Sequence, residues 1–416
     1  MSSILELPIE IWESVIDNVA DQGYDYTGWE TESKGDLRSC SLVCRSWVPR
    51  SRIHLFAVIL LQTESGPSKF AETLRENPKL GELVKELDID IRGALERATA
   101  ENQHWIPRIP HLLAGKLPNL SVFRCLGLHL SHLPNNFNNL FRVAFPSIRQ
   151  VALRETAYTH PDQMLRFVSQ ATPHVMKLHM SDLYSSNVLR FAPDTRPYRP
   201  PLAHLLHVDI RDFTSWIAFT RMLFLYMPSA TRLQSVLIKD YRGPVLTFNR
   251  HASERVSFLR SLVTFLSQCR DTLLELSLRL MHIPASVLLA HLNLRELVHV
   301  TQWDLAIHVT RRDDMTSFAK LLSGISSPVA AMTLDLWLDW NYISGEVDDD
   351  WVPLDSALSH AKFDETLFHY ITIWTRRLTT EYDRMAREDK LKRLPILNRR
   401  TWMDEDSTGS GGFHKG

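Results

Sequence analysis

Cysteine is scarce in this chain, which has four cysteines among its 416 residues. So few cysteines in so long a chain do not form a disulfide framework, and we expect four reduced, buried thiols. Neither sign of charge is in excess, since 47 Lys and Arg residues face 48 Asp and Glu residues. The chain as a whole therefore has no field that attracts nucleic acid or an anionic membrane, and we expect neither as a partner.

Long apolar runs are also missing, because no apolar run in the chain is long enough to span a bilayer. Glu6 and Glu10 lie where a secretory signal would carry a basic start followed by an apolar core. We therefore expect an intracellular protein, in the cytoplasm, the nucleus or both.

The usual catalytic motifs are absent as well, because the chain contains no GxGxxG, P-loop or HExxH sequence. Cys40 and Cys44 stand one helical turn apart, as metal ligands can, but no second pair of Cys or His follows at a suitable spacing. We expect no enzyme, no cofactor and no metal site. An enzyme with an unfamiliar site is the more distant alternative.

The most informative stretch that is present lies near the N-terminus. In LPIEIWESVIDNV, which starts at Leu7, apolar residues recur every three or four positions over a wide helical face, and Pro8 suits the first turn. A second apolar helix is predicted from an N-cap at Asp36 until Pro49 stops it. Three short helices of this kind cannot bury their own apolar surface, so they require a partner within the chain or outside it.

The order Leu-Pro-x-Glu-Ile, apolar helix, Asp-Leu and Leu-Val-Cys-Arg-x-Trp resembles an F-box. The resemblance implies docking onto the Skp adaptor of cullin-RING ubiquitin ligases. It places at the adaptor contact, or between the helices, the residues Leu7, Pro8, Ile11, Ile16, Leu37, Val43 and Trp47. One departure is the polar insertion from Asp21 to Gly35, where the family has a short connection. The alternative is an ordinary helical core.

A repeated pattern of apolar-x-x-apolar-x-apolar follows, preceded by a predicted first strand within Arg52 to Gln62. Its copies lie about 20 to 40 residues apart, around the upper end of leucine-rich repeat lengths. They occur at Val84/Leu87/Ile89, Leu120/Phe123/Cys125, Ile148/Val151/Leu153, Val175/Leu178/Met180, Leu205/Val208/Ile210, Leu233/Val236/Ile238, Leu273/Leu276/Leu278 and Val329/Met332/Leu334. Another copy begins at Leu294/Leu297 but is incomplete, because His299 occupies its third apolar position.

Helix-like segments separate these strands, so the predicted fold is α/β: a small three-helix F-box followed by a solenoid that resembles degenerate leucine-rich repeats, with its strands on the concave side. The predicted domains are 1–62, with the insertion at 21–35, then the solenoid at 63–345, then a C-terminal cap with a helical segment and a disordered tail at 346–416. A doubly wound sheet is the alternative, but no Gly-rich phosphate loop follows any strand.

The resemblance implies the substrate-recognition subunit of a Skp-cullin-F-box ubiquitin ligase. Near the C-terminus, the order Trp351, Leu354-Asp355, Leu358, Phe363 and the later Leu394-Pro395-Ile396-Leu397 resembles the C-terminal region of F-box and leucine-rich-repeat-like proteins abundant in mushroom-forming fungi. The F-box would hold the adaptor and, through it, a cullin, while the solenoid holds a protein target. A scaffold that binds the adaptor without leading to ubiquitination is the alternative, and the sequence does not separate the two.

The repeat register also predicts a target-binding surface. Residues directly before, between and after the last two apolar positions of each copy are expected to face the concave side, and cations gather there in the middle repeats. The candidates are Arg154, Lys177, Arg211, Lys239 and Arg279. Such a row would bind an acidic or phosphorylated target segment. A solvated polar face without a ligand is the alternative.

Overall fold

The computed structural model describes residues 8–21, 33–91, 103–185, 202, 204–212, 215, 232–240, 252–309, 312–338, 352–359, 363 and 367–375. The chain divides into two compact units. The first unit comprises Met1–Ala157 and Arg166–His174, and the second comprises Tyr158–Leu165 and Val175–Gly416.

The first unit begins with three helices, α1 (Ile9–Asp21), α2 (Ser33–Val43) and α3 (Val48–Ala57), which we call the helical module. Pro49 lies at the start of α3, where its missing N–H costs nothing, so it begins a helix instead of ending one as we expected. Helix α3 runs without a loop into strand β1 (Val58–Leu61). The predicted first strand is therefore shorter than Arg52 to Gln62, since its first half is helical.

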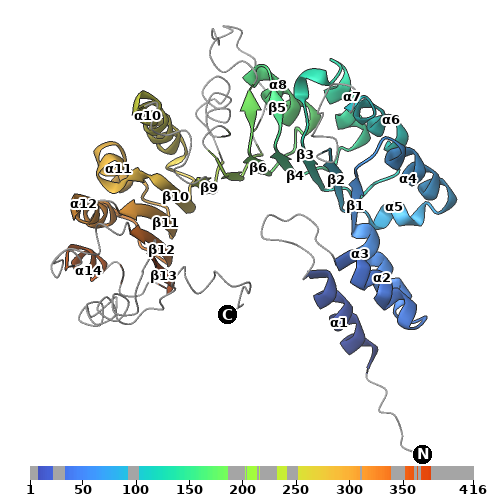
Figure 1. The fold of residues 1–416 in the computed structure, drawn as a ribbon, viewed down its shortest axis with the longest axis horizontal. Helices are drawn as coiled ribbons and strands as arrows, with labels where there is room; N and C mark the ends of the chain where they lie inside the picture. The colour runs from blue at the N-terminus through green and yellow to red at the C-terminus, as the bar shows by residue number, and fades with distance from the viewer. Residues whose placement is uncertain are drawn as a thin grey trace, which may run out of the picture. The chain divides into compact units, whose positions relative to one another are not determined.

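Four parallel strands continue the first unit in chain order, and helices lie along one side of them (Figure 1). After β1 the strands are β2 (Glu86–Asp90), β3 (Val122–Leu126) and β4 (Gln150–Arg154). The helices are α4 (Ser65–Glu76), α5 (Lys79–Leu83), η3 (Ile106–Arg108), α6 (Ile109–Leu113), η4 (Leu130–His132), α7 (Phe137–Ala144) and the π-helical η5 (Phe167–Ala171). Between the strands and helices, the rings of Phe123 and Phe141 pack edge to face at 4.8 Å.

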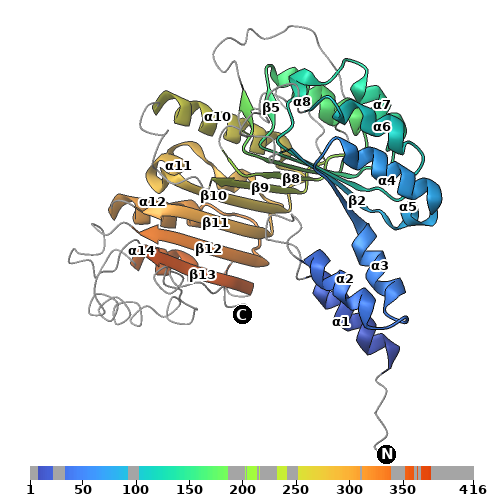
Figure 2. The ribbon, with the colours of Figure 1, turned by 45° about the vertical axis from the view of Figure 1, so that its right-hand side comes forward.

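The second unit repeats this plan with parallel strands in chain order, and its strands are longer from β9 onward (Figure 2). They are β6 (Lys177–Ser181), β8 (His207–Ile210), β9 (Ser235–Asp240), β10 (Glu275–Pro284), β11 (Gln302–Val309), β12 (Ala331–Leu338) and β13 (Leu367–Thr375). The helices are α10 (Ala252–Cys269), α11 (Ala285–His291), η7 (Leu294–Glu296), α12 (Arg312–Ser323) and α14 (Val352–Leu358). The short elements β5 (Ala157–Tyr158), α8 (Pro161–Arg166) and β7 (Tyr184–Ser185) complete the described chain.

Each of the eight complete apolar patterns lies on a strand and the residues just before it, and the matched residues are buried. The incomplete copy at Leu294 is wrong, because that residue begins the 3-10 helix η7. The strand of this repeat is β11, where Val300, Trp303 and Leu305 carry the pattern and are buried. We missed this copy of the pattern because tryptophan occupies its middle apolar position.

A left-handed backbone residue directly follows several strands. Gly127 follows β3, Glu155 follows β4 and Asp182 follows β6, with φ of 84°, 50° and 56°. Glycine adopts this conformation without strain and aspartate does so more readily than most other residues, so Glu155 is the strained position of the three. The same left-handed turn thus recurs at the ends of these three strands.

The predicted α/β fold class, with leucine-rich-repeat-like strands and helices in alternation, is confirmed in the described residues. The sheet of the second unit continues through β13, beyond residue 345 where we expected the solenoid to end. No helix of the described residues is both long and apolar enough to cross a membrane.

Candidate functional site

The helical module has a small core of its own. Ile16, Ala20 and Leu37 are buried in it, at 1%, 6% and 3% exposure. Partly buried apolar residues pack around them, namely Val19, Cys40, Trp47 and Leu55. The rings of Trp12 and Trp47 add a tilted aromatic contact at 5.1 Å. The module is thus organised around the inner stripe of α1.

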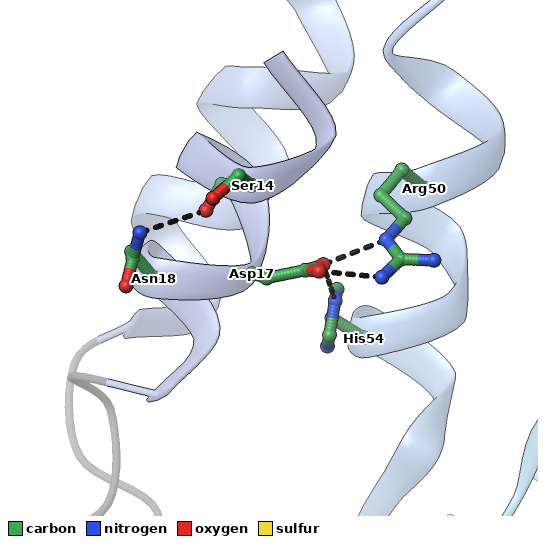
Figure 3. A network of polar contacts seen from close by, with 5 residues as sticks. All are labelled: Ser14, Asp17, Asn18, Arg50 and His54. Carbon is green, nitrogen blue, oxygen red and sulfur yellow. Dashed lines mark hydrogen bonds and ion pairs between the residues drawn. The ribbon is translucent and has the colours of Figure 1, made fainter. Parts of the chain in front are cut away.

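A polar cluster joins α1 to α3 at the edge of this core (Figure 3). Arg50 donates to Asp17 from Nε at 2.6 Å and from Nη2 at 2.5 Å, and His54 Nε2 lies 2.7 Å from Asp17 Oδ1. The hydrogen bonds from Arg50 lower the pKa of Asp17 to about 2, helped by His54 and opposed by burial. We call Asp17, Arg50 and His54 the Asp17 cluster.

The outer side of the module is unusually apolar. Ile11 and Val15 on α1 are 45% and 40% exposed, one turn apart. Leu42 and Val43, at the C-terminal end of α2, are 85% and 63% exposed. Because these side chains take no part in the module core, they form surplus apolar surface of the kind that binds another protein. These four residues are called the apolar face.

The residues predicted for adaptor contact divide between the core and this face. Ile16 and Leu37 are interior, so they hold the helices together and are not available to a partner. Pro8, Ile11 and Val43 are exposed, and Trp47 is partly buried against Trp12. Leu7 lies outside the described residues. Leu42, the most exposed residue of the apolar face, was not among the predicted contacts.

A second candidate surface is the face of the second-unit sheet opposite the helices. On β8 the residues Val208 and Ile210 are buried, while His207 and Asp209, which alternate with them, are partly exposed. The same alternation on β9 turns Ser235, Leu237 and Lys239 to this face. The predicted assignment of core and opposite positions therefore matches the burial pattern on these strands.

Charges of both signs meet on this face and pair with one another. Arg211 Nη2 lies 3.1 Å from Asp209 Oδ2, and His179 Nδ1 lies 2.8 Å from the same oxygen. Burial would raise the pKa of Asp209, but the hydrogen bonds and charges of His179 and Arg211 outweigh it, so that this pKa is lowered. The carboxylate is therefore ionised and committed to two partners.

Arg279 occupies the centre of a similar group two strands away. Its Nε lies 2.9 Å from Asp304 Oδ2, and its Nη1 lies 3.0 Å from Asp335 Oδ2. Ser277 donates to Asp304 at 2.7 Å. Lys239 lies between Arg211 and Arg279, and burial, with the charge of Arg279, lowers its pKa.

The structure brings together some of the residues predicted for target binding. Lys177, Arg211, Lys239 and Arg279 all belong to the second-unit sheet or follow directly on its strands. Arg154 belongs to the first unit, on β4, where its Nε lies 4.0 Å from Glu155. Asp304, one of the two carboxylates that bind Arg279, was not identified from the sequence, because it lies on strand β11, whose pattern was missed.

Comparisons with known proteins give distant structural similarities. No protein-family model and no curated protein matches the chain. A chain of the yeast Rad7–Elc1 complex aligns over 93% of this chain and 86% of its own, at 11% identity and a TM-score of 0.39. The leucine-rich repeat protein LegL7 of Legionella pneumophila aligns over 77% and 91%, at 11% identity and 0.37. An internalin of Listeria monocytogenes aligns over 97% and 99%, at 9% identity and 0.26.

Proposed function

We propose that this protein is the substrate-recognition subunit of a Skp-cullin-F-box type ubiquitin ligase. The observation that carries the proposal is the apolar face of the helical module, which coincides with the stretch that resembles an F-box. Ile11 and Val43 lie in matching positions of that motif and are exposed. An F-box would present these side chains to the Skp adaptor.

The division of apolar residues within the module supports this role. Ile16 and Leu37 belong to the buried core of the module. Ile11, Leu42 and Val43 are exposed and lie outside this core. Water contact with large apolar side chains costs about 25 cal/mol per Å², and a bound adaptor would remove that cost. The module is thus suited to association with another protein.

The strands and helices that follow supply the target-binding part of the proposed receptor. Parallel strands in chain order place side chains of successive repeats next to one another, which gives an extended protein-binding surface. In this role the protein does no chemistry itself and binds no cofactor. Other subunits of the ligase would transfer ubiquitin to the bound target.

The test is binding of the full chain to a purified Skp-type adaptor. Ile11→Asp and Val43→Asp each place a charge in the proposed contact, and we expect either to weaken binding at least 30-fold, which corresponds to about 2 kcal/mol. Val143→Asp is the matched control, because Val143 on α7 is 75% exposed and lies outside the module. Its binding should equal that of the unchanged chain.

Folded variants of Ile11 and Val43 that bind as tightly as the control would refute the adaptor contact. Ubiquitination is tested separately, in a reconstituted ligase containing the chain, the adaptor, a cullin and a target captured by the chain. A captured target that is never ubiquitinated would favour the scaffold role.

A further inference from the structure

Three cationic residues lie side by side on the second-unit sheet. Lys239 on β9 and Arg279 on β10 are partners in the strand register. Ile210 pairs with Ile238, so the next residues, Arg211 and Lys239, are neighbours too. Adjacent strands are about 4.8 Å apart, which brings the three side chains into one row. Like charges at this spacing repel one another unless anions compensate them.

Carboxylates compensate the two arginines directly. Arg211 donates from Nε and Nη2 to Asp209, at 3.2 and 3.1 Å. Arg279 forms ion pairs with both Asp304 and Asp335. Each of the three carboxylates is thereby paired with an arginine, while Asp209 Oδ1 has no hydrogen-bond partner.

Lys239 has no such partner among the residues that the structure describes, where no carboxylate lies within 4.0 Å of its ammonium nitrogen. Asp209 and Asp304 act on it only through their charge, against the charges of Arg279 and Arg211. Its side chain is also partly buried, so water replaces the missing anion poorly. A partly desolvated ammonium flanked by two guanidinium groups is a favourable place for an incoming anion.

We propose that Lys239 binds one anionic group, a carboxylate or a phosphate, carried by a side chain of the target protein. This inference rests on the proposed function, since it names the chemistry of the target that the receptor takes. The ammonium group supplies the ion pair. Arg211 uses Nε and one terminal nitrogen on Asp209, so its other terminal nitrogen provides a further donor on the adjacent strand.

The sequence predicts a row of cations that all contact the target in the same way, and the structure differs from this prediction. Arg211 and Arg279 are held in place by their own carboxylates, and Lys239 makes the primary contact. A single point charge between fixed guanidinium groups matches one anionic group, whereas a row of three unpaired cations would match a run of them. The target segment therefore needs only one acidic or phosphorylated residue at this position.

The experiment uses the full chain with its lysines converted to ¹³C-dimethyl-lysine, which keeps their charge and gives each an NMR signal. Sodium phosphate and sodium acetate are titrated separately, with sodium chloride added to hold the ionic strength constant. The exposed Lys177 on β6 is the internal control, and Lys239→Met and Lys177→Met identify the two signals. We expect the Lys239 signal to reach half its shift at an anion concentration at least tenfold below that for Lys177.

Signals of Lys239 and Lys177 that shift over the same concentration range, or a Lys239 signal that does not shift, would overturn the inference. A response to phosphate alone would indicate a phosphorylated target residue, and a response to acetate an acidic one. Adaptor binding is measured on the same Lys239→Met protein and should be unchanged. Anion binding without adaptor binding would overturn the proposed function but keep the anion site. Adaptor binding without anion binding would overturn the anion site but keep the proposed function.

Discussion

Asp17 on α1 and Arg50 on α3 form a two-pronged ion pair across 33 residues of sequence, with N–O distances of 2.6 and 2.5 Å. Asp17 lies two positions after Val15, which is about 200° further around the helix. The pair therefore ties down the edge of α1 that points away from Ile11 and Val15. It fixes α1 against α3 and leaves the apolar face uncovered.

The Asp17 pair makes the stability of the helical module dependent on pH. The pKa of Asp17 is lowered from 3.8 to about 2 in the folded chain. Its contribution is therefore complete above the unfolded pKa, near pH 4, and is lost as the pH falls through about 2. We expect Asp17→Asn to destabilise the folded chain by about 1 kcal/mol at pH 7, a modest value because solvent screens a carboxylate with 35% exposure.

Urea unfolding of both proteins, followed by circular dichroism at pH 7 and near pH 3, measures this difference. The destabilisation caused by Asp17→Asn should be smaller near pH 3 than at pH 7. Asp21→Asn is the control, because Asp21 is an exposed carboxylate on the same helix, and we expect it to change stability by less than about 0.5 kcal/mol at either pH. A difference for Asp17→Asn that grows toward acid would contradict the assignment.

The four cysteines should differ widely in their reaction with a maleimide. Cys44 is exposed, contrary to our expectation of four buried thiols, and the hydrogen bond with Ser46 lowers its pKa. Cys125 and Cys269 are buried, which raises the pKa of Cys269 to about 12. Since the thiolate is the reactive form, Cys44 should react first at pH 7 and the two buried thiols only on unfolding.

Mass spectrometry of the modified peptides over time measures these rates. Ser46→Ala should slow the reaction of Cys44 at pH 7, because it removes the hydrogen bond that stabilises the thiolate. A bound adaptor should slow it as well, since Val43 next to it belongs to the apolar face. Unchanged labelling of Cys44 in a saturated adaptor complex would count against the proposed contact at the end of α2.

Two glycines in helices of the first unit should respond in opposite ways to the same substitution. A Cβ atom on Gly81 of α5 would lie 2.0 Å from the carbonyl oxygen of Lys116, which belongs to the backbone and cannot rotate away. We expect Gly81→Ala to destabilise the first unit by about 2 kcal/mol or more. A Cβ atom on Gly35 of α2 meets nothing within 4 Å.

Gly35→Ala should therefore be neutral or stabilising, by up to about 1 kcal/mol, because alanine favours the helix. The two variants share the same loss of freedom in the unfolded chain, so their difference isolates the contact with Lys116. Thermal unfolding of both proteins measures it. Equal melting temperatures would mean that α5 and the residues around Lys116 do not pack as closely as described.

The strands were predictable because a buried parallel strand needs apolar residues at fixed positions, and Leu233, Val236 and Ile238 show that need in the sequence. Strand β11 was missed because Trp303 fills the place of an aliphatic residue. Helix boundaries were less accurate, since Pro49 equally suits the end of one helix and the first turn of the next. Strand β13 was assigned to the C-terminal cap, because we took the repeat pattern to end before it.

The helical periodicity identified the apolar face only in part. It shows that Ile11 and Ile16 both lie on a wide apolar surface, but α2 and α3 decide which of them is covered. The pairing of Arg279 with Asp304 and Asp335 was also beyond the sequence, because it depends on the register of three strands. Sequence periodicity determines which residues share a face. The helices and strands that pack next to that face determine which of these residues stay exposed to a partner.

The direct passage from α3 into β1 has a mechanical consequence. Helix α3 ends at Ala57 and the strand begins at Val58, whose carbonyl also accepts a hydrogen bond from Lys34 of α2 at 2.8 Å. The backbone N–H of Lys85 donates to Ala57 across to the next repeat, at 2.8 Å. Because no loop separates α3 from β1 and two hydrogen bonds brace this junction, the orientation of α3 relative to β1 is fixed locally, and a protein bound to the helical module would inherit that orientation.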